Sequence, residues 1–327
     1  MSGNAWRIRA RSAGGIEVLE REAIALPLPG PGEVRLRIVA SGVNFIDVYH
    51  RSGLYPLTFP AGLGVEAAGV VEAVGADVTG WAPGDRAAWA IPTPGTYATH
   101  ICVDANWLVP IPDGISDEVA AATLLKGFTC WMLVEQCARV RPGQIALVHA
   151  AAGGVGTLLI PWLKDAGAQV IAHAGTTEKA RIALENGADH ALSCPFDDLA
   201  EAVRSYTDGH GVDMAYDGVG AASWAASLGA MARRGLLISY GNASGPVPPV
   251  PPVELMKAGS IYLTRPTMYH YIDTKEARRE ASQRLFTMIA DGRLKVSIGQ
   301  RFPLERAADA HLALETRQTT GSTILYL

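Results

Sequence analysis

A glycine-rich turn follows a short apolar segment near the middle of the chain. Residues 145–149 (IALVH) read as a buried strand, and residues 150–156 (AAAGGVG) come directly after them and open a helix. In this context the glycines permit a tight turn and close approach of the backbone to a pyrophosphate, while the helix N-terminus offers free N–H groups. Because the spacing is AxxGxxG rather than GxGxxG, a turn that only packs the helix is the alternative. The context favours a dinucleotide site.

The end of the next apolar strand, residues 169–173, distinguishes the two nicotinamide dinucleotides. An NAD site usually places an acidic residue here to bind the ribose hydroxyl. This chain has no acid at the strand end. Instead, Gly175 and Thr176 leave room for a phosphate, and Lys179 supplies a cation one helical turn later. We therefore predict NADPH as the cofactor, with an ordinary solvated Lys179 as the alternative interpretation.

Two kinds of local pattern must position these residues. Before residue 118, short strands with turns between them, such as 33–39, 65–74 and 87–91, predict a compact barrel-like β domain. After it, helical stretches alternate with further strands, which predicts a doubly wound parallel sheet. The segments concerned are the helices 118–137 and 178–186 and the strands 145–149, 169–173, 189–193, 214–216 and 236–239. Residues 276–289 are expected to form a further long helix, and residues 323–327 a terminal strand. The proline-rich segment 246–252 is expected to be a surface loop.

Composition limits the class of protein. The chain has 327 residues, of which 49% are hydrophobic and 18% charged, so we expect two folded domains rather than disorder. The net charge of −4 gives no default attraction to nucleic acid or to an anionic membrane. The apolar stretch 144–163 is interrupted by glycines and a histidine and is not expected to cross a membrane. No apolar leader follows Met1, which makes the cytoplasm the expected compartment.

The four cysteines are few for a disulfide framework, and none are spaced as CxxC, which would suggest a zinc site. They are Cys102, Cys130, Cys137 and Cys194.

Several further motifs extend the pattern over essentially the whole chain. They are residues 42–47 (GVNFID), 51–56 (RSGLYP), 62–69 (GLGVEAAG), 126–129 (KGFT), 240–245 (YGNASG) and 264–266 (TRP). Together with the glycine turn, these motifs strongly resemble the zinc-independent quinone oxidoreductase (ζ-crystallin-like) branch of the medium-chain dehydrogenase/reductase superfamily. The resemblance implies an α/β protein with a GroES-like β-rich catalytic domain and a Rossmann cofactor domain built on a doubly wound parallel sheet.

The same resemblance implies an interrupted domain order. Residues 1–123 would form the first part of the catalytic domain, residues 124–265 the inserted NADPH-binding domain, and residues 266–327 the return to the catalytic domain. It also implies a homodimer.

Zinc is not expected. Zinc-dependent members of the superfamily have a cysteine in the first motif and His-Glu in the second, and this chain has Asn44 and Val65-Glu66 at these places. Between residues 90 and 120, where a structural zinc would need four cysteines, Cys102 is alone. Hydride transfer to an already electrophilic quinone would then depend mainly on orientation.

The resemblance implies which side chains surround the reacting groups. The candidate catalytic residues are Asn44, Tyr49, Tyr55, Lys126 and Thr129. Asn44 or Thr129 would bond the nicotinamide carboxamide, and a tyrosine hydroxyl would donate to the developing hydroquinone oxygen. The alternatives are that the tyrosines only pack and that Lys126 only caps a helix or pairs with an acid.

The expected cofactor contacts are more numerous. They are Asn44, Asp47, Thr129, Gly153, Gly154, Val155, Gly175, Thr176, Lys179, Cys194, Gly218, Tyr240, Gly241, Asn242, Ser244, Thr264, Arg265, Pro266 and Arg317. Cys194 stands where close relatives have a tyrosine beside the 2′-phosphate, which weakens the expectation of strict NADPH selectivity.

Three functions follow as hypotheses. The first is NADPH-dependent reduction of quinones by hydride transfer, and the second is reduction of enones or 2-alkenals by a protein of the same superfamily. The third belongs to another class, a non-catalytic NADPH-binding protein that is crystallin-like or binds RNA. The charge of −4 and the lack of a Lys/Arg-rich stripe with aromatic residues argue against an RNA partner.

Overall fold

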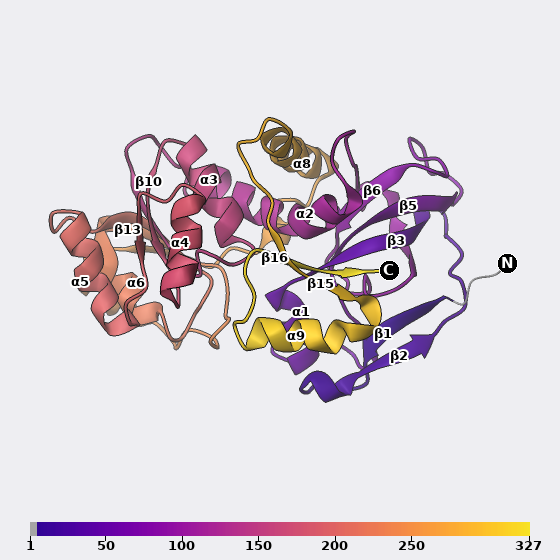
Figure 1. Cartoon of the computed structure of the whole chain (residues 1–327), viewed down its shortest axis with the longest axis horizontal. Helices are drawn as coiled ribbons and strands as arrows, with labels where there is room; N and C mark the ends of the chain where they lie inside the picture. The colour runs from indigo at the N-terminus through magenta and orange to yellow at the C-terminus, as the bar shows by residue number, and fades with distance from the viewer. Residues whose placement is uncertain (1–4) are drawn as a thin grey trace. The chain divides into compact units, whose positions relative to one another are not determined.

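The computed structural model of the protein describes residues 5–327 and divides the chain into two compact units (Figure 1). Unit 1 contains the residues up to Gly127 together with Asp273–Ala290 and Val296–Leu327. Unit 2 contains Phe128–Ile272 and Asp291–Lys295. The chain therefore leaves unit 1 within helix α2 (Asp117–Trp131) and ends in unit 1 again.

Unit 1 is a β-rich unit with two sheets among the described residues. One sheet has the strand order β15-β16-β3-β5-β6-β8, with β7 also pairing with β3, and the other has the order β2-β1-β4. The strands are β1 (Trp6–Ala10), β2 (Leu19–Ala23), β3 (Glu33–Val43), β4 (Ala61–Gly62), β5 (Glu66–Val74), β6 (Arg86–Ala90), β7 (His100–Asp104), β8 (Leu108–Pro110), β15 (Ile298–Pro303) and β16 (Ser322–Tyr326). The helices are η1 (Ile16–Val18), α1 (Phe45–Ser52), η2 (Ala105–Trp107), α8 (Lys275–Ala290), η5 (Leu304–Arg306) and α9 (Ala307–Glu315).

Strand β3 organises the core of unit 1. Its alternating sequence turns Val34, Leu36 and Ile38 inward, where each is at most 1% exposed, and they pack in one cluster with Trp89. The terminal strand β16 pairs antiparallel with the other end of β3, so that Thr323 lies opposite Val43. The last residues of the chain thereby support the strand that leads into Asn44.

Unit 2 contains a six-stranded sheet among the described residues, with the order β11-β10-β9-β12-β13-β14. Every neighbouring pair is parallel. The strands are β9 (Ile145–Val148), β10 (Gln169–His173), β11 (His190–Leu192), β12 (Val212–Asp217), β13 (Met231–Ser239) and β14 (Tyr262–Thr264). The helices are η3 (Met132–Cys137), α3 (Gly156–Asp165), α4 (Thr177–Glu185), α5 (Phe196–Tyr206), α6 (Trp224–Ala230), α7 (Pro252–Lys257) and η4 (Met268–His270).

This sheet confirms the predicted doubly wound architecture. Helices α3 and α4 contact β9, β10 and β11, while α6 contacts β12 and β13. Central residues such as Leu147, Ala215 and Leu237 are fully buried, as expected for parallel strands covered on both faces. The strand order reverses between β9 and β12. A ligand crevice is expected at this point, beyond the carboxyl ends of the strands.

Two segments refine the sequence-based expectations. The helix predicted over 118–137 is α-helical only to Trp131, and η3 continues it as a π-helix in which the Ala138 N–H donates to the Leu133 carbonyl at 3.0 Å. The proline-rich segment is a loop as predicted, and it ends where Pro252 begins α7. Within residues 5–327, no helix combines the length and the apolar character that a membrane crossing requires.

Candidate active site

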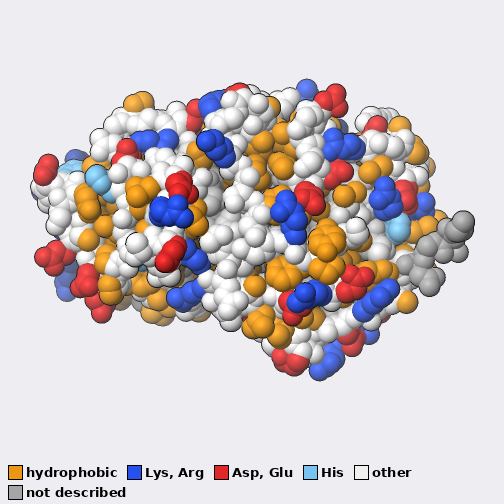
Figure 2. Space-filling view, in the orientation of Figure 1, with side chains coloured by type: hydrophobic (Ala, Val, Ile, Leu, Met, Phe, Trp, Pro, Cys, Tyr) orange, Lys and Arg blue, Asp and Glu red, His pale blue; other side chains and the backbone are white. Residues whose placement is uncertain are grey.

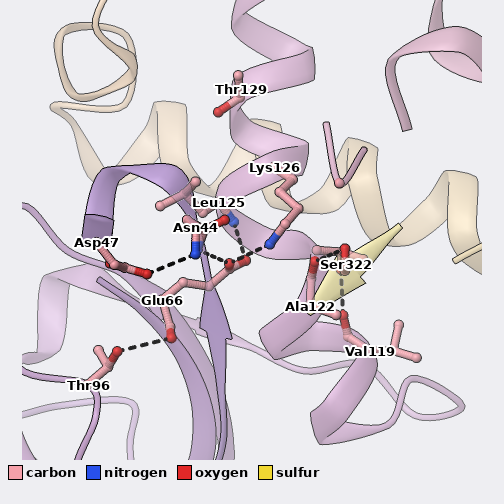
Figure 3. Close-up of polar contacts among 12 residues, drawn as sticks. Asn44, Asp47, Glu66, Thr96, Val119, Ala122, Leu125, Lys126, Thr129 and Ser322 are labelled. Carbon is pink, nitrogen blue, oxygen red and sulfur yellow. Dashed lines mark hydrogen bonds and ion pairs between the residues drawn. The ribbon is translucent and has the colours of Figure 1, made fainter. Parts of the chain in front are cut away.

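The carboxylate of Glu66, at the start of β5, is the centre of a buried polar cluster in unit 1 (Figure 3). One oxygen accepts from the side-chain amide of Asn44 at 2.9 Å and from the ammonium of Lys126 at 3.0 Å. The other accepts from the Leu125 N–H at 2.7 Å. Glu66 is fully buried and Lys126 is 3% exposed. The cluster therefore brings together two predicted catalytic residues, Asn44 and Lys126, through an acid that had no predicted role.

Asn44 is held by its backbone as well as by its side chain. It precedes α1 in extended conformation, and its N–H donates to the Asp47 carboxylate at 2.8 Å, as in a capping box. The side chains of Asn44 and Asp47 thus have different partners: the Asn44 amide donates to Glu66, and the Asp47 carboxylate accepts from the backbone of Asn44. Asp47, which is predicted as a cofactor contact, supports the backbone of Asn44 in this structure.

Asp47 is completely buried, and its carboxylate has few donors. Oδ2 accepts from the Tyr97 hydroxyl at 3.0 Å in addition to the Asn44 N–H, whereas Oδ1 has no partner among the described residues. Burial raises the pKa of Asp47 to about 7, against the opposing effect of these two hydrogen bonds.

The two predicted tyrosines lie next to each other in unit 1. The rings of Tyr49 and Tyr55 have centroids 5.2 Å apart, and the Tyr55 N–H donates to the Tyr49 carbonyl at 3.0 Å. Tyr49 is 8% exposed, and Phe45 packs on its ring at 6.0 Å. Tyr49 lies in the second turn of α1 and Tyr55 lies three residues beyond the end of this helix, so the two rings pack together just after Asn44 in the sequence.

In unit 2 most of the predicted cofactor residues share one edge of the sheet. They follow the carboxyl ends of the parallel strands: residues 153–155 after β9, Gly175, Thr176 and Lys179 after β10, Cys194 after β11, Gly218 after β12, Tyr240, Gly241, Asn242 and Ser244 after β13, and residues 264–266 at the end of β14. Parallel strands bring these turns to the edge where α/β proteins bind their ligands.

The turn after β9 requires its glycines. A Cβ on Gly156 would lie 2.5 Å from the Ala151 carbonyl oxygen and 2.6 Å from that of Ala150. A Cβ on Gly153 would lie 3.1 Å from the same Ala150 oxygen, whereas one on Gly175 would meet nothing within 4 Å. The strand, the tight turn and the first turn of α3 therefore fit a pyrophosphate, and the open tip of β10 fits an adenosine ribose.

The turns after β12 and β13 pack directly on each other. A Cβ on Gly218 would lie 2.9 Å from the ring of Tyr240, and one on Gly241 would lie 2.4 Å from the Gly218 carbonyl oxygen. The Ser244 hydroxyl donates to the Val219 carbonyl at 2.8 Å. Four predicted residues are thus brought together in one compact pair of loops.

Asp217, which had no predicted role, holds this pair of loops in place. It is 1% exposed, and one oxygen accepts from the backbone N–H groups of Val219 at 2.8 Å and Gly220 at 3.0 Å. The hydroxyls of Ser223 and Ser227 also donate to it, at 2.7 and 2.6 Å to its other oxygen. These bonds fix the turn that contains Gly218.

Two buried histidines lie at the carboxyl ends of β9 and β10. Because the Ser227 hydroxyl donates to Asp217, it accepts from His149 Nε2 at 2.8 Å, and His149 carries its proton there. His173 Nε2 donates to the Cys194 carbonyl at 2.9 Å. Burial lowers the pKa of His149 to about 4 and also lowers that of His173, so both rings are neutral at neutral pH. They support the edge rather than carry charge.

The remaining predicted residues have simpler surroundings. Thr176 caps α4 by accepting from the Lys179 N–H at 3.3 Å, which places Lys179 in the first turn of that helix. The Thr129 hydroxyl lies 3.8 Å from Met268 Sδ. Arg317 follows α9 in unit 1 with a positive φ of 59°.

No role was predicted from the sequence for two acids, Glu66 of unit 1 and Asp217 of unit 2, or for Tyr97 and His311 of unit 1, although each forms buried hydrogen bonds within its own unit. A signal existed for the first two, since each is a single acid that adjoins an apolar strand segment. Within residues 5–327, no group of three or more His, Cys, Asp or Glu side chains is arranged to hold a metal ion.

The fold and the site define the class of protein. A family model described as the alcohol dehydrogenase GroES-like domain matches residues 30–113, and one described as zinc-binding dehydrogenase matches residues 186–325. A GroES-like unit joined to a doubly wound parallel-sheet unit is the architecture of the medium-chain dehydrogenases/reductases.

Full-length relatives identify the family. The chain is 46% identical to a quinone oxidoreductase of Pseudomonas aeruginosa over 98% of this chain and 99% of the relative. It matches the crystal structure of Escherichia coli quinone oxidoreductase complexed with NADPH with a TM-score of 0.96 at 41% identity, covering 98% of this chain and 100% of that one. A 2-haloacrylate reductase of a Burkholderia species is 40% identical over 95% of this chain and 96% of its own length. The chain belongs to the quinone oxidoreductase family.

Proposed function

We propose that this protein reduces quinones by hydride transfer from NADPH. The observation that carries the proposal is the shared carboxyl edge of the six parallel strands of unit 2, where the predicted cofactor residues gather. The quinone oxidoreductases similar to it over their full length support the same activity, and one of them was crystallised with NADPH. When bound, NADPH supplies the hydride.

Within this proposal, unit 2 binds the dinucleotide. Residues 153–155 and the N-terminus of α3 would hold the pyrophosphate, and the loops containing Gly218 and Tyr240 would hold the nicotinamide half. Gly175 and Thr176 would leave space for the 2′-phosphate, and Lys179 would supply a positive charge to it. Arg265, Pro266, Asn242 and Arg317 complete the contacts, as the family resemblance implies.

The residues that the family resemblance assigns to the reacting groups are Asn44, Tyr49, Tyr55, Lys126 and Thr129. Asn44 and Thr129 would orient the nicotinamide carboxamide, and the hydroxyl of Tyr49 or Tyr55 would donate to the developing hydroquinone oxygen. Because the Lys126 ammonium is bonded to Glu66 at 3.0 Å, Lys126 acts through Glu66 on the position of Asn44. Orientation of the two reactants supplies most of the acceleration.

The test is NADPH oxidation with a quinone such as naphthoquinone, run in parallel with NADH. We expect kcat/KM to be about tenfold higher with NADPH, which is what one charge contact to the 2′-phosphate provides. Substitution of Lys179 by Met should remove this preference and leave NADH oxidation unchanged. Equal rates with both cofactors in the unaltered protein would refute the assignment of the 2′-phosphate site.

The 2-haloacrylate reductase relative makes an activated alkene the second candidate substrate. Turnover of 2-alkenals or enones without turnover of any quinone would establish this alternative. A non-catalytic role would be established if neither substrate class were reduced.

Nucleic acid is not a proposed partner. Positive and negative side chains are interspersed over the face drawn in Figure 2, without a broad area of one sign. Absence of salt-dependent RNA binding in a filter assay would agree with this proposal.

We further propose a cytoplasmic homodimer. All four cysteines are thiols rather than disulfides, as expected in a reducing compartment. Strand β14 is an edge of the parallel sheet, its Tyr262 and Leu263 are exposed, and Met256 of α7 is exposed as well. A second copy could pair along this edge. Light scattering of the protein and of a Leu263→Asp variant tests this arrangement, which predicts a monomeric variant.

The domain boundaries complete the proposal. Residues 1–123 and 266–327 would form the catalytic domain, with residues 124–265 as the NADPH-binding insert. Expression of residues 124–265 alone, followed by measurement of NADPH binding, tests whether the insert is sufficient for the cofactor.

A further inference from the structure

A chain of buried hydrogen bonds crosses unit 1 from helix α9 to the start of α1. Arg51 Nη1 lies 3.2 Å from His311 Nδ1, and His311 Nε2 lies 3.1 Å from the Tyr97 hydroxyl. The Tyr97 hydroxyl then lies 3.0 Å from Asp47 Oδ2. His311, Tyr97 and Asp47 are each 0% exposed. No predicted function accounts for this chain of contacts.

Arg51 fixes the direction of every hydrogen bond in the chain. A guanidinium only donates, so His311 Nδ1 must accept and Nε2 must carry the proton. The His311 Nε2–H then donates to the Tyr97 oxygen, which leaves the Tyr97 hydroxyl proton for Asp47. The chain is therefore polarised toward the carboxylate, and His311 is neutral. Its pKa is lowered to about 3 by burial and by the Arg51 charge.

The far end of the chain is anchored as well. Arg51 forms two hydrogen bonds to the Glu315 carboxylate, at 2.9 and 2.7 Å, and its Nε donates to the Gly14 carbonyl at 3.1 Å. Because Arg51 lies on α1 while Glu315 and His311 lie on α9, these bonds join the two helices. The guanidinium cannot turn away from His311 without breaking them.

At its near end the chain meets the backbone of Asn44. Asp47 Oδ2 accepts from both Tyr97 and the Asn44 N–H, at 3.0 and 2.8 Å. The other oxygen of Asp47 has no partner among residues 5–327. Rotation of this carboxylate would therefore be opposed by these two bonds, and the position of Asn44 depends on Tyr97.

We propose that Tyr97 and His311 are positioning residues for the reaction, which hold Asn44 in place through Asp47. The proposal rests on the proposed function, in which Asn44 orients the nicotinamide. Neither residue touches the reacting groups in this mechanism. Their effect is exerted through the carboxylate and the first turn of α1.

The arrangement also makes the position of Asn44 sensitive to protonation of Asp47. The groups that face Asp47 are Tyr97, Glu66 of β5 and Lys126 of α2, with Arg51 and His311 behind Tyr97. The Tyr97 hydroxyl favours the ionised form, because it donates to the carboxylate. Loss of this hydroxyl should therefore raise the pH at which Asp47 loses its proton.

The first experiment compares pH profiles of kcat/KM for a quinone. In the unaltered protein we expect activity to fall as pH decreases through an inflection. Tyr97→Phe should move this inflection upward by about one pH unit, the value of one hydrogen bond to a charged group. His311→Leu should move it in the same direction, and His311→Gln, whose amide can donate to Tyr97 and accept from Arg51, should restore the original profile.

Tyr216→Phe is the matched control, because it removes another buried tyrosine hydroxyl, which lies 3.3 Å from Met214 Sδ in unit 2. We expect its pH profile to equal that of the unaltered protein. A profile that is unchanged in both Tyr97→Phe and His311→Leu would overturn the proposal. So would an equal shift in Tyr216→Phe.

The second experiment needs no activity. Hydrogen–deuterium exchange measured on a peptide that contains Asn44 should speed up about tenfold in His311→Leu, the effect of about 1.4 kcal/mol, but not in His311→Gln or Tyr216→Phe. If no quinone is reduced by the unaltered protein, the proposed function fails alone, and this exchange measurement still decides whether His311 positions Asn44. Unchanged exchange at Asn44 in His311→Leu would refute the positioning role.

Discussion

The ion pair between Lys126 and Glu66 can be tested by removing each partner separately and then both. The ammonium and the carboxylate are 3.0 Å apart, and their side chains are 4% and 0% exposed. Lys126→Met leaves a buried carboxylate without its counter-charge, which costs about 3–5 kcal/mol of unfolding free energy. Adding Glu66→Gln should restore part of this loss in the double variant, because the glutamine amide is neutral and its carbonyl oxygen can still accept from Asn44, although its NH2 group then faces the Leu125 N–H.

The coupling free energy of this cycle is therefore expected to reach about 2–3 kcal/mol, as for directly bonded groups. It is measured by urea unfolding of the four proteins at one pH and one ionic strength. The matched control is the exposed i,i+4 pair Arg181–Glu185, whose side chains are 70% and 57% exposed. Its cycle, made with Met and Gln in the same way, should give a coupling below about 0.5 kcal/mol.

Activity of the same variants separates two roles of Lys126. If Lys126 acts only through Glu66, the double variant should be more active than Lys126→Met, because Asn44 regains a neutral and stable partner. If the ammonium itself acts on the substrate, the double variant should be as slow as the single one. If the double variant instead loses the sum of the stabilities lost by the two single variants, Lys126 and Glu66 do not stabilise each other, and the ion pair does not explain why Lys126 is buried.

Three further predictions follow from the geometry. Gly156→Ala should weaken NADPH binding by about tenfold or more, because the added Cβ would lie 2.5 Å from a carbonyl oxygen. Gly175→Ala should fold normally, because its Cβ would meet nothing within 4 Å. Isothermal titration of NADPH checks both variants. Asp47→Asn should change how stability depends on pH. The pKa of Asp47 is about 7 in the folded protein against an ordinary 3.8, so the folded state binds this proton more tightly than the unfolded state. The stability that this proton contributes is therefore fully present below about pH 4 and is lost by about pH 7. The unaltered protein should lose up to about 4 kcal/mol relative to Asp47→Asn across this range in urea unfolding. Asp217→Ala should lower the free energy of unfolding by about 3 kcal/mol or more, because it leaves two backbone N–H groups and two serine hydroxyls without their acceptor; a loss below about 1 kcal/mol would show that water replaces the carboxylate.

The features that were predicted correctly from the sequence are local ones. The glycine turn of residues 150–156 is recognisable because a strand, a turn and a helix adjoin along the chain. The alternation of residues 33–39 specifies a half-buried strand in the same way. The doubly wound parallel sheet follows from repeated strand–helix units, and the family resemblance implied the GroES-like unit.

The features that were missed are contacts between distant parts of the chain. Tyr97 and His311 are separated by 214 positions, and Glu66 and Lys126 by 60. No periodicity links such residues, and a lone buried histidine or tyrosine looks like ordinary core. A residue's partner decides its role, and these partners become visible only when the sheet and α9 are assembled.

Asn44 combines a feature that was evident from the sequence with contacts that were not. Its motif and its place before a helix were evident, which made it a candidate contact for the cofactor. Its three anchors, at Glu66, Asp47 and, behind these, Tyr97, required the structure. The motif therefore made Asn44 a candidate, and the structure shows which groups its backbone and side chain are bonded to.

The most direct test of the central claim is the steady-state oxidation of NADPH with naphthoquinone as acceptor. We expect turnover with NADPH, slower turnover with NADH, and loss of most activity in Asn44→Ala while NADPH still binds through the glycine turns of unit 2. Absence of NADPH oxidation with every quinone tested, from a folded protein that binds NADPH, would contradict the proposed function.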